Sequence, residues 1–323
     1  MLRSFQYTEK SYLDYKMQSD VLRNQEINIA RKYVESHNKT EKEVCNCPVC
    51  KNGVGKHFYN KWGVEYVRCN ECKTVYAIYE DETVTEYNNS EELLGLRLSE
   101  EYQSQITENR ENVWNDFLDW LSVRSFRFMR RREGLNIVDI GNRFRGYTKC
   151  IQQSKLCGIY NLRESILQES EETIKDGEAD IVFYLDQMQK EMRPVEKLVK
   201  IGNCLKDDGL LVLNTRAGSG FDIIALKENN EKIYPYEHIL LPSVKGLMHM
   251  LEDSGYEVLE ITTPGVMDVK YVMDSKDKLG DDDIFLKYLM EESNQSALQE
   301  FQRFLQKNCM SSFVCVIARK VKR

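Results

Sequence analysis

Four cysteines in two matched pairs carry the clearest chemical signal in the sequence. Cys47 and Cys50 form one C-x-x-C pair, and Cys69 and Cys72 form the other. Two tight turns with this spacing can present four thiolates tetrahedrally to zinc, and four protein ligands leave no position for a substrate. We therefore predict a structural zinc site. Cys45 is a near neighbour that could substitute for Cys47, but Cys45-Asn-Cys47 is too short for a knuckle turn.

Composition and charge limit what the chain can be. It has 323 residues, of which 41% are hydrophobic, enough for about two domains with a sizeable core. The net charge is -7, so no global basic field attracts nucleic acid. The longest apolar runs fall far short of the roughly 18 residues that span a bilayer, and no apolar secretion signal follows Met1. We expect a cytoplasmic protein with a small-molecule substrate, and neither a membrane nor a nucleic acid as partner.

The elements that must position the chemistry follow from the apolar pattern, which divides the chain into four parts. Residues 1–40 are rich in helix formers, and residues 41–80 change to a composition typical of a small separate zinc ribbon. Residues 81–132 are expected to hold a linker and a long amphipathic helix from about 108 onward. In residues 133–323, short apolar runs alternate with helical stretches, which predicts an α/β domain with a mainly parallel sheet. These runs lie at 136–140, 158–161, 181–185, 209–214, 256–262 and 312–318, the last two framing a long amphipathic segment at 281–306.

Several segments of the α/β part resemble class I methyltransferases, which use S-adenosylmethionine (SAM). Val138-Asp139-Ile140-Gly141 stands where that family has its glycine-rich cofactor turn, and the segment 205–213 resembles its fifth strand with the turn before it. Matching segments then follow in order from 220 to 269. With the zinc ribbon in front, the chain resembles bacterial methyltransferases of sugar and glycan biosynthesis, sugar C-methyltransferases included. The resemblance implies a Rossmann-like methyltransferase sheet, SAM as cofactor and a nucleotide-linked sugar or related small molecule as methyl acceptor.

The resemblance also implies cofactor contacts at the carboxyl ends of the strands, where ligands of open α/β sheets bind. These contacts are Asp139, Gly141, Asn142, Asn161 and Asp186. An alternative interpretation is that Asp139 and Asp186 only cap the starts of helices.

The sequence departs from the family at several places. Arg143 occupies a glycine position of the cofactor turn. The second strand is expected to end at Asn161, where the family has an acid that holds the ribose, with Glu164 one turn further on. The stretch between the second and fourth strands leaves little room for the usual third strand. Gln189 and Lys190 stand where the family often has a Glu-His pair.

Acid–base chemistry on the acceptor is expected in the segment after the fifth strand. Methyl transfer to oxygen or carbon requires that a proton be removed. The candidates are His238 as the base, Glu237 to orient or replace it, and Tyr236 to bond a substrate oxygen. Arg216 can pair with a phosphate or carboxylate, and Asp222 closes a glycine-containing turn that can approach the acceptor. The alternative is that His238 only anchors its loop by a hydrogen bond.

The function expected from these residues is SAM-dependent methyl transfer to a small molecule such as a nucleotide-sugar or glycan precursor. The alternative is a degenerate methyltransferase-fold protein that has lost SAM and acts as a binding or scaffold subunit, which the departures favour. An RNA methyltransferase is disfavoured by the acidic charge.

Overall fold

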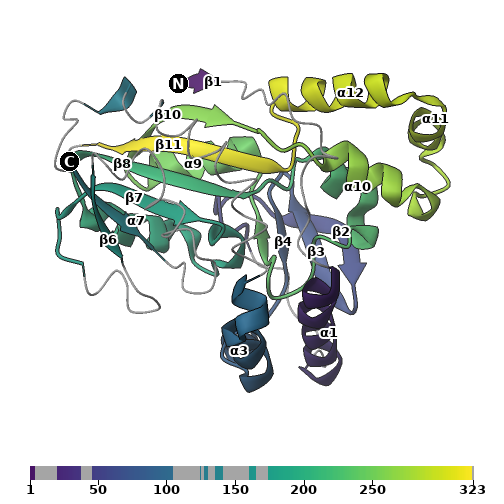
Figure 1. The fold of residues 1–323 in the computed structure, drawn as a ribbon, viewed down its shortest axis with the longest axis horizontal. Helices are drawn as coiled ribbons and strands as arrows, with labels where there is room; N and C mark the ends of the chain where they lie inside the picture. The colour runs from purple at the N-terminus through teal and green to yellow at the C-terminus, as the bar shows by residue number, and fades with distance from the viewer. Residues whose placement is uncertain are drawn as a thin grey trace.

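Two β-sheets organise the computed structural model, which describes residues 1–3, 20–37, 46–104, 124, 127–129, 135–140, 160–164 and 174–321. A seven-stranded sheet forms the body of the molecule. A four-stranded sheet lies at one end of it, between the large sheet and helices α1 (Asp20–His37) and α3 (Glu91–Leu98) (Figure 1).

The large sheet is the predicted Rossmann-like α/β sheet, and all six strands expected for it are present. Its order is β1 (Leu2–Arg3), β10 (Tyr256–Thr262), β11 (Phe313–Lys320), β8 (Leu205–Arg216), β7 (Ala179–Leu185), β5 (Leu135–Asp139) and β6 (Tyr160–Glu164). Every strand runs parallel to its neighbours except β11, which is antiparallel to both β8 and β10. All seven residues of β7 are buried, as is usual for a central strand of a parallel sheet. Among the described residues β6 is the edge strand, in agreement with the short connection to β7.

Two groups of helices accompany this sheet. On one face α7 (Pro194–Cys204) packs against α9 (Val244–Asp253); Pro194 starts the first helix and the Ser243 side chain caps the second. A second group builds its own apolar cluster beside the carboxyl end of β8. Its members are α8 (Phe221–Leu226), α10 (Asp268–Asp274), α11 (Ile284–Glu292) and α12 (Gln295–Lys307). The amphipathic segment predicted at 281–306 is therefore two helices, because Asn294 caps α12 and ends the run of α11.

The smaller sheet differs from the separate ribbon expected from the sequence. Three of its strands come from the cysteine-containing segment: β2 (Gly55–Lys61), β3 (Val64–Cys69) and β4 (Val75–Ala77). The fourth strand is β9 (Leu240–Leu241), which belongs to the α/β part and pairs antiparallel with β4. Val67 and Val75 share one apolar core with Leu240 and Leu251. A ribbon of this size buries too little apolar area alone, so it joins the larger core.

Two helices occupy most of residues 81–98, where the sequence predicted a linker. α2 (Asp81–Asn88) and α3 both pack against α1, and α1 and α3 project from the ribbon end of the molecule (Figure 1). Most of the long helix predicted at 108–132 lies outside the described residues. None of the described helices is both long and apolar enough to cross a bilayer.

Candidate functional site

The four predicted metal ligands come together in space. The sulfur atoms of Cys47, Cys50, Cys69 and Cys72 all lie within 4.8 Å of one another, and the Sγ–Sγ distance is 3.6 Å both for Cys47 with Cys72 and for Cys50 with Cys69. Four thiolates around zinc at Zn–S bonds of ~2.3 Å stand about 3.8 Å apart, so the cluster fits a tetrahedral zinc ion. Three of the four cysteines are buried, as expected for a closed structural site.

Both halves of the metal cluster use the same local fold. Lys51 and Lys73, which directly follow the second cysteine of each pair, have φ of 61° and 63°, and each N–H donates to the carbonyl of the first cysteine. The chain therefore reverses within each pair and turns two sulfur atoms the same way. Gly53 passes so close that a Cβ atom there would stand 2.2 Å from Cys69 Sγ. Only glycine fits this approach.

The metal cluster is tied to the loop that carries the predicted catalytic residues. Beyond the pairing of β4 with β9, Ala77 N–H donates to the carbonyl of Ile239 (2.9 Å), and Tyr66 OH donates to the carbonyl of His238 (3.0 Å). The Ser243 hydroxyl donates to the carbonyl of Cys72. The ribbon therefore fixes the loop 234–243 from its metal-bearing side.

The carboxyl edge of the parallel strands holds two acidic residues side by side. Asp139, at the end of β5, is the register partner of Glu164, at the end of β6. Asn161 lies three residues before Glu164 and pairs with Asn136, so Asn161 does not stand at the carboxyl edge of the sheet. The second strand is therefore longer than predicted, and its last residue is Glu164. Gly141 and Asn142 lie outside the described residues.

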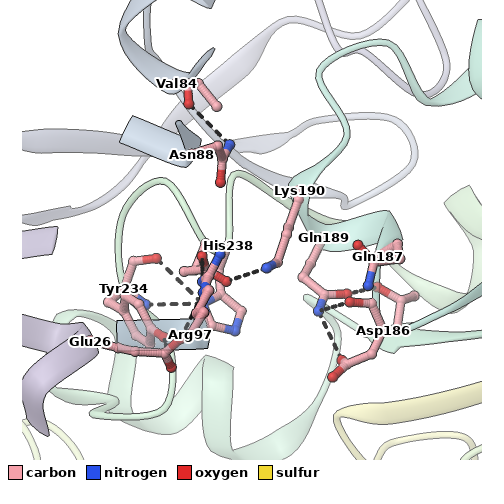
Figure 2. Close-up of polar contacts among 12 residues, drawn as sticks. Glu26, Val84, Asn88, Arg97, Asp186, Gln187, Gln189, Lys190, Tyr234 and His238 are labelled. Atoms are coloured by element: carbon pink, nitrogen blue, oxygen red, sulfur yellow. Dashed lines mark hydrogen bonds and ion pairs between the residues drawn. The ribbon is translucent and has the colours of Figure 1, made fainter. Parts of the chain in front are cut away.

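Asp186 also lies at this edge, directly after β7. It has a positive φ of 59°, its N–H donates to Asn214 Oδ1 (2.7 Å), and its Oδ1 accepts from Gln189 Nε2 (2.8 Å). Gln189 Oε1 in turn accepts from Thr215 Oγ1 (3.1 Å). Figure 2 shows Gln189 turned toward Asp186. The ends of β7 and β8 are therefore joined by side chains, and Gln189 has a structural task there.

Glu237 lies in a buried ion network that the sequence analysis did not foresee. Its carboxylate accepts from Arg97 on α3 and pairs with Lys190 Nζ at 2.6 Å. Arg97 also donates to Glu26 on α1 (3.0 Å), and Glu26 accepts from the hydroxyl of Tyr102 (2.8 Å). Figure 2 shows Lys190 reaching toward this network from one side and Arg97 lying beside Glu26. These contacts hold the loop, η2 (Met188–Lys190) and two helices together.

The two neighbours of Glu237 have different surroundings. Tyr236 is 2% exposed and packs among aromatic rings, with centroids 5.2 Å from Tyr87 and 5.8 Å from Tyr33. His238 Nδ1 lies 3.3 Å from the backbone nitrogen of Tyr234, which donates to it. Burial, which outweighs the opposing charge of the Glu237 carboxylate, lowers the pKa of His238 to about 3. A neutral imidazole with so low a pKa is a poor proton acceptor at neutral pH.

Arg216 and Asp222 belong to a buried polar cluster at the end of β8. Arg216 Nη1 donates to Ser312 Oγ (3.3 Å), and Asp222 accepts from Asn230 Nδ2 (3.1 Å). Asp268, which the sequence analysis missed, accepts from Ser312 N–H and Ser311 Oγ, both at 2.6 Å. Burial, and then the neighbouring carboxylate of Asp268, raise the pKa of Asp222 to about 7. Two carboxylates around one guanidinium explain why one of them holds a proton readily.

Comparisons with known proteins give fold-level similarity only. No family model and no curated protein sequence matches this chain. Geranyl diphosphate methyltransferase in complex with SAM is 10% identical, with a TM-score of 0.38 over 69% of this chain and 92% of that chain. A SAM-dependent methyltransferase from Mesorhizobium loti is 12% identical, with a TM-score of 0.35 over 63% of this chain and 98% of that chain. Phosphoethanolamine N-methyltransferase 2 of Haemonchus contortus is 15% identical, with a TM-score of 0.36 over 61% of this chain and 51% of that chain. Similarity at this level carries no argument about activity, which has to come from the residues themselves.

Proposed function

We propose that this protein is a SAM-dependent methyltransferase that acts on a small-molecule acceptor and carries a structural zinc ion. The observation that carries the proposal is the pairing of Asp139 with Glu164 at the carboxyl edge of two parallel strands. Ligands of open α/β sheets bind at this edge, and a carboxylate there can accept two hydrogen bonds from the hydroxyls of a ribose. The resemblance of 138–141 to the cofactor turn of class I methyltransferases points to the same place.

The proposed cofactor contacts follow from this edge. Glu164 takes the ribose-binding role first expected of Asn161, with Asp139 at the end of the neighbouring strand β5 and Asp186 directly after β7, the next strand along the sheet. Gly141 and Asn142 complete the set through their position in the sequence, two and three residues after Asp139. When bound, SAM supplies an electrophilic methyl group on a sulfonium, and the task of the chain is to orient the acceptor and manage its proton.

The acceptor side is proposed at the end of β8. Arg216 can pair with an anionic group of the acceptor, and Asp222, with a pKa of about 7, is better suited than His238 to receive a proton. His238 and Tyr236 then shape the loop, and Glu237 holds it through Arg97 and Lys190. From the resemblance and from Arg216 we propose a nucleotide-linked sugar or glycan precursor as the acceptor class.

Calorimetric titration of the zinc-loaded protein with SAM and with S-adenosylhomocysteine tests this function. We expect both to bind, and we expect Glu164→Gln and Asp139→Ala each to weaken binding by about tenfold or more, the value of a hydrogen bond to a charged group. Glu252→Gln, an exposed position on α9, is the matched control and should bind as the wild type does. Equal affinity in the control and in Glu164→Gln would contradict the proposed ribose contact.

One observation favours a second candidate, a binding or scaffold protein of the same fold. Gln189 and Lys190, which replace the Glu-His pair of the family, are both committed to structural contacts, with Asp186 and Thr215 and with Glu237. A chain without that pair can keep the fold and lose the reaction. If neither SAM nor S-adenosylhomocysteine binds, this candidate replaces the methyltransferase.

A further inference from the structure

A cavity of about 450 Å³ lies between α1, the segment 226–232 and α10. Its volume is in the range of pockets that hold small ligands. Its lining includes the polar and aromatic residues Arg23, Asn230, Lys232, Lys270, Tyr271 and Lys278.

The charge of the lining is positive although the whole chain has a net charge of -7. Four cations face the cavity, from Arg23, Lys232, Lys270 and Lys278, against the two carboxylates of Glu231 and Asp274. Lys270 pairs with Asp274 (2.7 Å) and Lys278 with Glu231 (2.5 Å). Four positive charges and two negative charges leave an excess of two positive charges. A ligand with two negative charges would balance it.

Arg23 is the most informative of these cations. Its Nε is shielded from solvent, and within the described part of the chain no oxygen accepts a hydrogen bond from it. A buried guanidinium N–H without an acceptor is costly, and the planar fork of arginine matches phosphate oxygens. Arg23 therefore lines the cavity with a guanidinium group that keeps one N–H without an acceptor among the described residues.

A further cation lies just behind the cavity wall. Lys61 is 5% exposed and donates to the carbonyl of Asn230 (2.6 Å). Burial, together with the nearby charges of Arg31 and Lys278, lowers the pKa of Lys61 to about 8, while the carboxylates of Glu231 and Glu228 act in the opposite direction. An anion placed among these cations would stabilise their charged forms.

The cavity is connected to the proposed acceptor site by one side chain. Tyr271 lines the cavity, its ring centroid lies 5.2 Å from Lys232 Nζ, and it is close enough to Arg216 for the guanidinium to act on the pKa of its hydroxyl. Arg216 is the last residue of β8, at the carboxyl edge of the sheet. A molecule that reaches from this edge past Tyr271 would place its far end among Arg23 and Lys232.

We propose that this cavity is a diphosphate-binding subsite, in which Arg23 and Lys232 hold the phosphate groups of the methyl acceptor. The identity of the ligand as the methyl acceptor rests on the proposed function, but anion binding at this site can be measured independently of that function. Arg23 donates to one phosphate group from α1, Lys232 approaches from the segment after α8, and Tyr271 separates the anion from the reacting end.

The test is calorimetric titration of the full-length zinc-loaded protein with inorganic pyrophosphate, in low and in high salt. We expect saturable binding that weakens as salt is raised, and a loss of about tenfold or more in Arg23→Gln and in Lys232→Gln. Arg23→Lys keeps the positive charge but loses the planar guanidinium group, so its affinity for pyrophosphate should lie between those of the wild type and Arg23→Gln. Lys245→Gln, an exposed change on α9, removes one positive charge outside the cavity and should bind as the wild type does.

Titration of the same variants with SAM separates this inference from the proposed function. Arg23→Gln should bind SAM with wild-type affinity, which also shows that the variant is folded. Pyrophosphate binding that Arg23→Gln leaves unchanged, or no pyrophosphate binding by a wild-type protein that binds SAM, would overturn the subsite and leave the methyltransferase standing. Pyrophosphate binding that depends on Arg23 in a protein that does not bind SAM would support the anion site and contradict methyl transfer.

Discussion

The Ser243 hydroxyl donates a hydrogen bond to the carbonyl of Cys72 and accepts one from the backbone N–H of Gly246 (2.8 Å). One side chain therefore caps α9 and holds the last cysteine of the metal cluster. A Cβ atom on Gly246 would stand 2.5 Å from Thr74 Oγ1, so the first turn of α9 sits directly against the second cysteine pair. The metal cluster and the α/β part share this contact, and changes in one should be measurable in the other.

Cys72→Ser should release the metal and loosen the loop 234–243. Three thiolates bind zinc far more weakly than four, and the ribbon depends on the metal for much of its stability. We expect loss of zinc by elemental analysis, together with faster hydrogen exchange in 234–243, because β9 and Ser243 lose their partners. Cys309→Ser, outside the cluster, is the control and should retain zinc. Full zinc content in Cys72→Ser would refute this ligand.

Gly53→Ala should weaken the metal site without removing a ligand. The new Cβ would stand 2.2 Å from Cys69 Sγ, so the sulfur or the turn has to move. We expect earlier zinc release on titration with a chelator. Gly95→Ala is the matched control, because nothing lies within 4 Å of its Cβ position. Since Gly95 lies inside α3, that change should stabilise the protein by about 0.5–1 kcal/mol. Equal chelator sensitivity of the two variants would disprove the steric argument.

The elements of the sheet could be predicted from the sequence because their apolar runs are short and bounded by turn residues. The limits of the runs were less certain. Asn161 was expected to end the second strand, yet the strand runs on to Glu164, because pairing with β5 rather than the apolar run sets its length. Because of that difference of three residues, Glu164 was expected one turn beyond the strand and was not counted among the cofactor contacts.

Contacts between distant segments could not be predicted. Glu237 and Lys190 are separated by 47 positions and Glu237 and Arg97 by 140, and nothing in the local sequence marks them as partners. The two-residue strand β9 is likewise too short to give a pattern, so the docking of the ribbon was missed. The four cysteines were found because their types and spacing alone define the site.

Glu237→Gln should lower the stability of the folded protein, because Glu237 has a structural role. The change removes the negative charge that Arg97 and Lys190 share, and it leaves Glu26 as the remaining carboxylate of the network. We expect the free energy of unfolding to fall by about 3 kcal/mol, the cost of breaking a buried ion pair. Glu196→Gln breaks an exposed pair with Arg193 and should change it by less than about 1 kcal/mol. An unchanged stability with lost turnover would instead make Glu237 a catalytic group.

His238 should stay neutral through the physiological range. Because its pKa is lowered to about 3 in the folded protein and the unfolded value is 6.5, the stability that the neutral ring supports is complete above pH 6.5 and is lost as pH falls from 6.5 toward 3. Relative to His238→Gln, the wild type should lose about 2 kcal/mol between pH 6.5 and pH 5. Urea unfolding at several pH values measures this, and NMR should show no titration of the His238 ring between pH 5 and 8. An inflection near pH 6.5 in that signal would restore His238 as a candidate base.

Asp222→Asn should remove a stability cost that appears as the pH rises. Its pKa is raised to about 7 in the folded protein, against an ordinary value of 3.8, so the folded state keeps a proton that the unfolded chain has released. The stability linked to that proton is complete below pH 3.8 and is lost as pH rises to about 7. The amide oxygen of asparagine can still accept from Asn230 Nδ2, so the hydrogen bond at 3.1 Å is kept. We expect the stability of Asp222→Asn, relative to wild type, to increase by about 3 kcal/mol between pH 5 and pH 8 in urea unfolding. Asp253→Asn, at an exposed position on α9, should follow the wild-type curve. If Asp222→Asn also runs parallel to wild type, the carboxyl of Asp222 is already ionised at pH 5, and its carboxylate lacks the raised pKa on which its proposed role as the base rests.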